Sequence, residues 1–132
     1  MKKRTLNKLV RDRIPNILIK TGLAFKAKEC PNIIDALMDK LVEEVNELVE
    51  THAYCKHICN EEPTSAEEQS NMNDLILSEA ADVFEVFTNL LKEWGYTTAD
   101  LQKAVEKKRA DHGAFEDKIY LEWVEEEKKS EY

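Results

Sequence analysis

The sequence contains little glycine and little proline, with three of each in 132 residues, whereas average usage would give about nine glycines. It therefore has no glycine-rich phosphate-binding loop of either the G-x-G-x-x-G or the G-x-x-x-x-G-K-[ST] kind. A β-sandwich or β-barrel needs turn residues roughly every 8–12 positions, and the chain has too few. We expect one all-α domain, because a chain of this length holds a single hydrophobic core.

Long hydrophobic runs and excess positive charge are also lacking. No apolar run approaches the roughly 18 residues of a membrane-spanning helix, and the N-terminal region does not resemble a signal peptide. The net charge of −8 argues against general affinity for nucleic acid or anionic membranes. Three cysteines cannot all pair within one chain, which favours a reducing compartment. We expect a cytoplasmic protein without nucleic-acid or membrane partners.

The charges that are present are unevenly distributed. Residues 1–13 carry a net charge of +5, whereas residues 41–82 carry eleven carboxylates against one lysine, a net charge of −10. A site that holds both metal cations and an anionic ligand needs such an asymmetry.

Prolines near helix starts and glycines near helix ends divide the chain into four helices. They are expected between Pro15 and Gly22, from Pro31 to about Ala53, from a capping box at Thr64 or Ser65 to Trp94, and from Thr97 to about Asp111. Residues 115–123 are expected as a short extended segment and 124–132 as a charged tail. The fold predicted is all-α and four-helix bundle-like.

The third of these helices is hydrophobic over more than half of its circumference. One neighbouring helix cannot cover so wide a face. We therefore expect this helix to be central or to lie at a subunit interface, in a dimer or a higher oligomer.

Four carboxylates lie on unexpected faces of the second and third helices. On a wheel of about 100° per residue, Glu44 lies beside the apolar arc of its helix and Glu47 one step further out. Glu79 falls within the apolar arc of the third helix and Asp82 at its margin. Each pair is spaced i,i+3 and can point at one spot.

Four such carboxylates would repel one another unless a cation lay between them. Hard divalent cations such as Mg²⁺ or Mn²⁺ take all-oxygen ligands, which two antiparallel helices can supply. The alternative is that each carboxylate is solvated or paired with lysine or arginine.

Four motifs follow one another along the chain: N-K-L-V-R-D-R-I-P at 7–15, E-E-V-N-E at 43–47, E-A-A-D at 79–82 and K-K-R-A-D-H-G-A-F at 107–115. Together they resemble the all-α nucleoside triphosphate pyrophosphatases, the MazG-like superfamily, and especially its phosphoribosyl-ATP pyrophosphohydrolase-like branch. The resemblance covers residues 6–121. Two features depart from the family pattern: His112 stands where arginine is usual, and residues 52–66 look like an insertion.

The resemblance implies a function for the site. Glu44, Glu47, Glu79 and Asp82 match the family's metal ligands, so that Mg²⁺, or Mn²⁺ in its place, would serve as cofactor. Lys8, Arg11 and Lys108 match basic residues that face the nucleotide phosphates. The activity implied is hydrolysis of a nucleoside triphosphate to the monophosphate and pyrophosphate. The alternatives are a phosphoribosyl-ATP pyrophosphohydrolase and a non-catalytic helical dimerisation module.

The insertion contains a second group of metal-ligating side chains, His52, Cys55, His57 and Cys59. Their spacing is not a usual structural zinc pattern. We expect an ordinary helix end with reduced cysteines, with a zinc site as the alternative.

Overall fold

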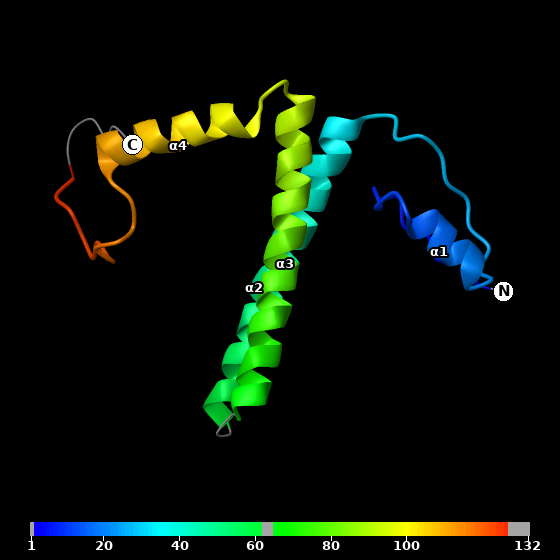
Figure 1. Cartoon of the computed structure of the whole chain (residues 1–132), viewed down its shortest axis with the longest axis horizontal. Coiled ribbons are helices and arrows are strands. Elements are labelled where there is room, and N and C mark those ends of the chain that lie inside the picture. The colour runs from blue at the N-terminus through cyan, green and yellow to red at the C-terminus, as the bar shows by residue number, and fades with distance from the viewer. Residues whose placement is uncertain (1, 62–64, 127–132) are drawn as a thin grey trace. The chain divides into compact units, whose positions relative to one another are not determined.

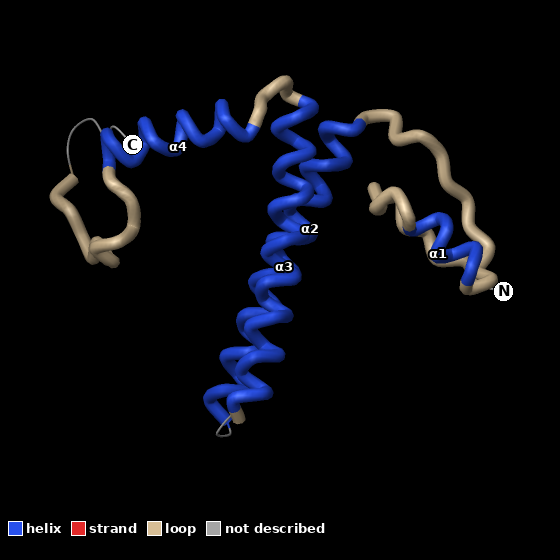
Figure 2. The backbone as a smooth tube through the Cα atoms, in the orientation of Figure 1, coloured by secondary structure: helices blue, strands red, loops and turns tan. Residues whose placement is uncertain are grey.

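In a computed structural model, residues 2–61 and 65–126 are described, and they form four helices and no strand (Figures 1 and 2). The helices are α1 (Ile14–Lys20), α2 (Ile33–Glu61), α3 (Ala66–Glu93) and α4 (Thr98–His112). The all-α prediction is confirmed for this part of the chain. None of these helices is long and apolar enough to cross a membrane.

The chain divides into two units, residues 1–97 and residues 98–132. In the first unit, α2 and α3 pack against each other as a long antiparallel pair (Figure 1). The second unit contains α4, none of whose residues is buried. The single domain expected from the chain length stays a prediction, as does a bundle that includes all four helices.

Local signals account for the start and the end of α3. Ser65 is its N-cap, and the Ser65 Oγ accepts a hydrogen bond from the backbone N–H of Glu68 at 3.1 Å. Thr64, the alternative cap, lies outside the described residues. At the other end, Gly95 adopts φ +85°, and the N–H of Tyr96 donates to the carbonyl of Leu91 at 2.8 Å. This left-handed ending is the one that glycine favours.

The second helix is longer than the sequence predicts. Asn32 caps its start, since the Asn32 Oδ1 accepts from the N–H of Asp35 at 3.2 Å. The expected end near Ala53 is wrong, because α2 continues to Glu61. No glycine or proline interrupts residues 54–61, and at about 100° per residue the buried Cys55 lies on the same side of α2 as the buried Leu37. Residues 52–61 of the predicted insertion thus lengthen the helical pair; the insertion itself stays a prediction.

The C-terminal segment also differs from the expectation. Residues 115–123 contain no strand; instead the N–H of Lys118 donates to the carbonyl of Phe115 at 3.3 Å and closes a turn. Because no other strand lies among the described residues, an extended segment has nothing to pair with. Most of the predicted charged tail, residues 127–132, lies outside the described part.

The hydrophobic core lies where α2 begins and α3 ends. Leu37, Val86 and the fully buried Leu90 form its centre. Four half-buried residues pack around it: Leu9, Ile33, Ile34 and Leu41. Leu9 comes from the N-terminal segment, between Lys8 and Arg11 in the sequence. Packing of Leu9 therefore fixes the basic N-terminal segment against the helical pair.

Candidate cation site

The four predicted carboxylates meet between α2 and α3. Glu44 and Glu47 come from α2, and Glu79 and Asp82 come from α3. One carboxylate oxygen from each lies within 4.8 Å of the others, so that together they could hold a metal ion. The i,i+3 spacing on each helix places both side chains of a pair on one side, and the antiparallel packing brings the two pairs together.

Two carboxylate oxygens in this cluster are buried without a hydrogen-bond partner, Oε2 of Glu44 and Oε2 of Glu79. Glu44 is only 7% exposed. Burial raises the pKa of Glu44, and the neighbouring Glu47 raises it further. A buried, unpartnered carboxylate oxygen costs free energy that a bound cation offsets. The donor set therefore fits a metal ion, and its oxygen-only chemistry fits a hard one.

Lys40 is a member of the site that sequence reasoning missed. Its Nζ lies 3.3 Å from Oε1 of Glu44 and 3.4 Å from Oε2 of Glu43, and its side chain is only 16% exposed. The sequence does contain a signal for it. Lys40 precedes Glu43 by three residues and Glu44 by four, and side chains at these spacings are neighbours on a helix. Because Lys40 pairs with Oε1 of Glu44, it is Oε2 of Glu44 that has no hydrogen-bond partner in the cluster.

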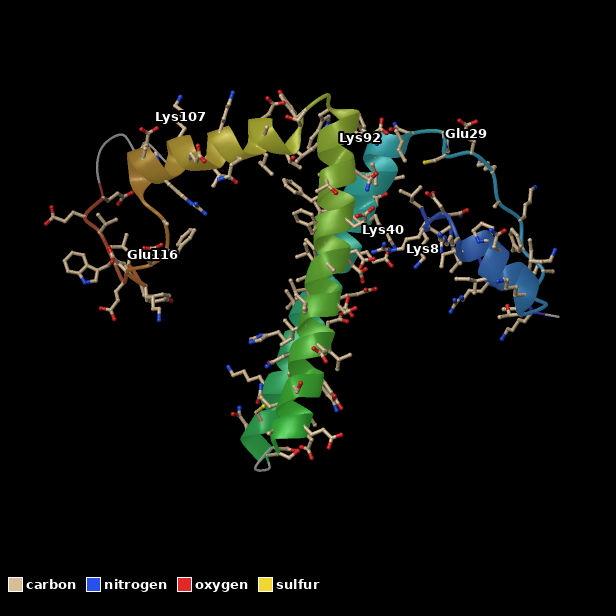
Figure 3. The ribbon with its side chains drawn as sticks, viewed as in Figure 1. Lys8, Glu29, Lys40, Lys92, Lys107 and Glu116 are labelled. Carbon is tan, nitrogen blue, oxygen red and sulfur yellow. The ribbon has the colours of Figure 1, made fainter. Side chains whose placement is uncertain are left out.

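The N-terminal segment brings two predicted basic residues to the same place. Arg11 Nη2 lies 2.6 Å from Asp82 Oδ1, and Lys8 Nζ lies 3.0 Å from Glu43 Oε1. Figure 3 shows Lys8 and Lys40 close together beside the helical pair. Both partners of each pair are partly exposed, so each ion pair contributes only about 0–1 kcal/mol to stability. Lys8 and Arg11 can therefore exchange these carboxylates for an anionic ligand at little cost.

Glu43 has a larger part than the helix wheel indicates. The wheel places it on the face opposite the apolar arc, but its carboxylate binds both Lys8 and Lys40. The hydrogen bond from Lys8 is the main cause that lowers the pKa of Glu43, and Lys40 lowers it further, against an opposing effect of burial. Glu43 thus lies between Lys8 of the N-terminal segment and Lys40 of its own helix, beside the four carboxylates.

Lys108 lies in α4, which belongs to the second unit. It is exposed there. Its contact with a nucleotide phosphate stays a prediction.

The histidines and cysteines of residues 52–59 are not gathered into a group of three or more that could hold a metal ion. Among the described residues, the four carboxylates are the only group of three or more potential metal-ligating side chains of this kind. His57 instead lies 3.4 Å from Glu61, and the Cys59 Sγ lies 3.9 Å from Sδ of Met72 on α3. All three cysteines are free. Residues 52–59 lie inside α2 and not at its end, so the expected helix end is wrong there, while the free cysteines agree with the expectation of unpaired thiols.

Comparisons of the chain with models of protein families, with curated proteins and with solved structures find no match.

Proposed function

We propose that the protein is a Mg²⁺-dependent nucleoside triphosphate pyrophosphohydrolase, with Mn²⁺ as a substitute cofactor. It hydrolyses a nucleoside or deoxynucleoside triphosphate between the α- and β-phosphates. The observation that carries the proposal is the set of four carboxylates within 4.8 Å, two of them with buried, unpartnered oxygens. The adjacent Lys8 and Arg11 and the resemblance of the four sequence motifs support it. A role in removing unwanted nucleotides from the cellular pool follows from this activity.

Each group of the site has a role in the proposed reaction. Glu44, Glu47, Glu79 and Asp82 hold the cation. A divalent cation there polarises phosphoryl oxygens and lowers the pKa of water. Lys8 and Arg11 leave their partly exposed carboxylate partners and bind the polyphosphate, as charged donors commonly do.

The bond changes are those of a simple hydrolysis. Water oxygen attacks the α-phosphorus in line with the bridging oxygen, the bond between that phosphorus and the bridging oxygen breaks, and pyrophosphate leaves. One of the four carboxylates accepts the proton of the water. Because the chain lacks a glycine-rich loop, the phosphates have to be bound through side chains and cations.

The alternatives explain the site less well. In a non-catalytic helical module Glu79 would be expected to pair with a lysine or arginine, yet no ion pair to Glu79 is found within residues 2–61 and 65–126. A phosphoribosyl-ATP pyrophosphohydrolase would use the same cation chemistry. The N-terminal N-K-L-V-R-D segment favours the branch that acts on free nucleotides.

The direct test is pyrophosphate release from a panel of ribo- and deoxynucleoside triphosphates, with phosphoribosyl-ATP included. We expect release of pyrophosphate and the matching monophosphate with Mg²⁺ or Mn²⁺, and none in excess EDTA. Release of inorganic phosphate in place of pyrophosphate would contradict the assigned bond. No turnover on any member of the panel would contradict the activity.

A second copy of the chain is the partner that we propose. Met38, Val42, Val45 and Val49 form an exposed apolar stripe along α2, and these four side chains are 39–61% exposed. Leu77 and Phe84 of α3 are 69% and 64% exposed. At about 100° per residue, these residues lie on the side of the helical pair that faces away from Glu47 and Asp82. A dimer formed through this face would bury it and leave the cation site accessible.

Substitution of Val49 with lysine tests this interface. We expect light scattering to give the mass of a dimer for the wild-type protein and of a monomer for Val49→Lys, because a lysine would carry a charge into an apolar interface. Tyr54→Lys is the control, since Tyr54 is equally exposed at 60% but lies on another face of α2. A wild-type protein that remains monomeric at high concentration would contradict the proposal.

A further inference from the structure

The charges around the cation site do not balance. The five carboxylates of the region are those of Glu43, Glu44, Glu47, Glu79 and Asp82, and the three basic side chains that contact them are those of Lys8, Lys40 and Arg11. This group carries two net negative charges when all its members are ionised. One divalent cation neutralises it.

The three basic side chains differ in how firmly they are held. Lys8 and Arg11 are 41% and 59% exposed, and each contacts a single carboxylate. Lys40 is 16% exposed and lies between two carboxylates of its own helix, three and four residues along. When Lys8 and Arg11 leave their carboxylate partners and bind an anionic ligand, Lys40 keeps its contacts with Glu43 and Glu44. Lys40 is thus the fixed positive charge of the site.

We infer that Lys40 limits the free site to one divalent cation and that a second cation enters only together with a polyphosphate. The inference rests on the proposed function and concerns how its cofactor is loaded. A polyphosphate that takes Lys8 and Arg11 frees Oδ1 of Asp82 and Oε1 of Glu43, whose Oε2 stays paired with Lys40. These carboxylates and the phosphate oxygens then attract another cation. Lys40 acts through Glu44 and Glu43, so it is a positioning residue and not a ligand.

Titration with Mn²⁺ by isothermal calorimetry, without nucleotide, tests this role. The wild-type protein should bind one Mn²⁺ per chain. In Lys40→Met, which keeps the length of the side chain and removes its charge, a second Mn²⁺ should bind on the order of tenfold to a hundredfold more tightly than in the wild-type protein, by Coulomb's law at short range. Lys40→Arg, which keeps the charge, should again bind one.

Controls separate this effect from general changes. Lys56→Met removes the charge of an exposed lysine on the same helix and should leave one Mn²⁺ bound. Lys40→Gln is a second neutral variant, and circular dichroism reports whether each variant is folded. One Mn²⁺ in both the wild-type protein and the folded neutral variants, or two in the wild-type protein, would overturn the role of Lys40. No Mn²⁺ bound to the wild-type protein would instead overturn the cation site on which the proposed function depends.

Discussion

Replacement of Glu79 by glutamine should reduce Mg²⁺-dependent pyrophosphate release by on the order of a hundredfold to a thousandfold, because a cation ligand contributes several kcal/mol to transition-state stabilisation. Glutamine has nearly the shape of glutamate but offers one neutral oxygen in place of a charged carboxylate. Glu79 has an unpartnered buried oxygen, and no ion pair to it is found in the described residues. Its charge is therefore available to a cation. The measurement is kcat and KM for the best nucleotide of the panel.

The matched control for Glu79→Gln is Asp74→Asn, which removes an exposed carboxylate from the same helix. Its activity should equal that of the wild-type protein. Circular dichroism should show the same helical content in both variants. Full activity in a correctly folded Glu79→Gln protein would rule out the four-carboxylate site as the catalytic centre.

The limits of α3 could be predicted from the sequence because local interactions fix them. The Ser65 hydroxyl bonds to a backbone N–H three residues away, and Gly95 supplies a left-handed residue at the end. The end of α2 could not be predicted in the same way. Beyond Ala53 its apolar pattern thins, and the helix continues alongside α3, where Cys59 contacts Met72. That contact is between two different helices, so no local sequence signal predicts it.

The same distinction applies to the cation site. The meeting of Glu44, Glu47, Glu79 and Asp82 could be predicted, because their helical faces follow from spacing and apolar periodicity. The partner of Lys8 could not. Lys8 contacts Glu43 because Leu9 packs on the core at the start of α2. The N-terminal segment is irregular there, so it has no sequence periodicity that would predict where it packs.

Replacement of Glu44 by glutamine should have opposite effects on stability with and without Mg²⁺. In EDTA the variant should be more stable than the wild-type protein by about 1 kcal/mol, since it buries a neutral amide where the wild-type protein buries a charged oxygen without a partner. With Mg²⁺ at about 100 times its dissociation constant, the wild-type protein should gain about 2.7 kcal/mol. The variant should gain much less. Urea unfolding followed by circular dichroism measures both.

The pH dependence in EDTA gives an independent check on the same residue. The pKa of Glu44 is raised above its ordinary value of 4.5 in the folded chain, so between that value and the folded pKa the native state binds more protons than the unfolded state. The contribution of Glu44 to stability is therefore full below this window and is lost as the pH rises through the folded pKa. Glu44→Gln should lack this loss, whereas Glu50→Gln, at an exposed position of the same helix, should retain it. A Glu44→Gln variant that is less stable than the wild-type protein in EDTA at neutral pH would contradict this prediction. The ion pair between Glu44 and Lys40 would then stabilise the fold by more than burial of the carboxylate costs, and the main role of Glu44 would be structural.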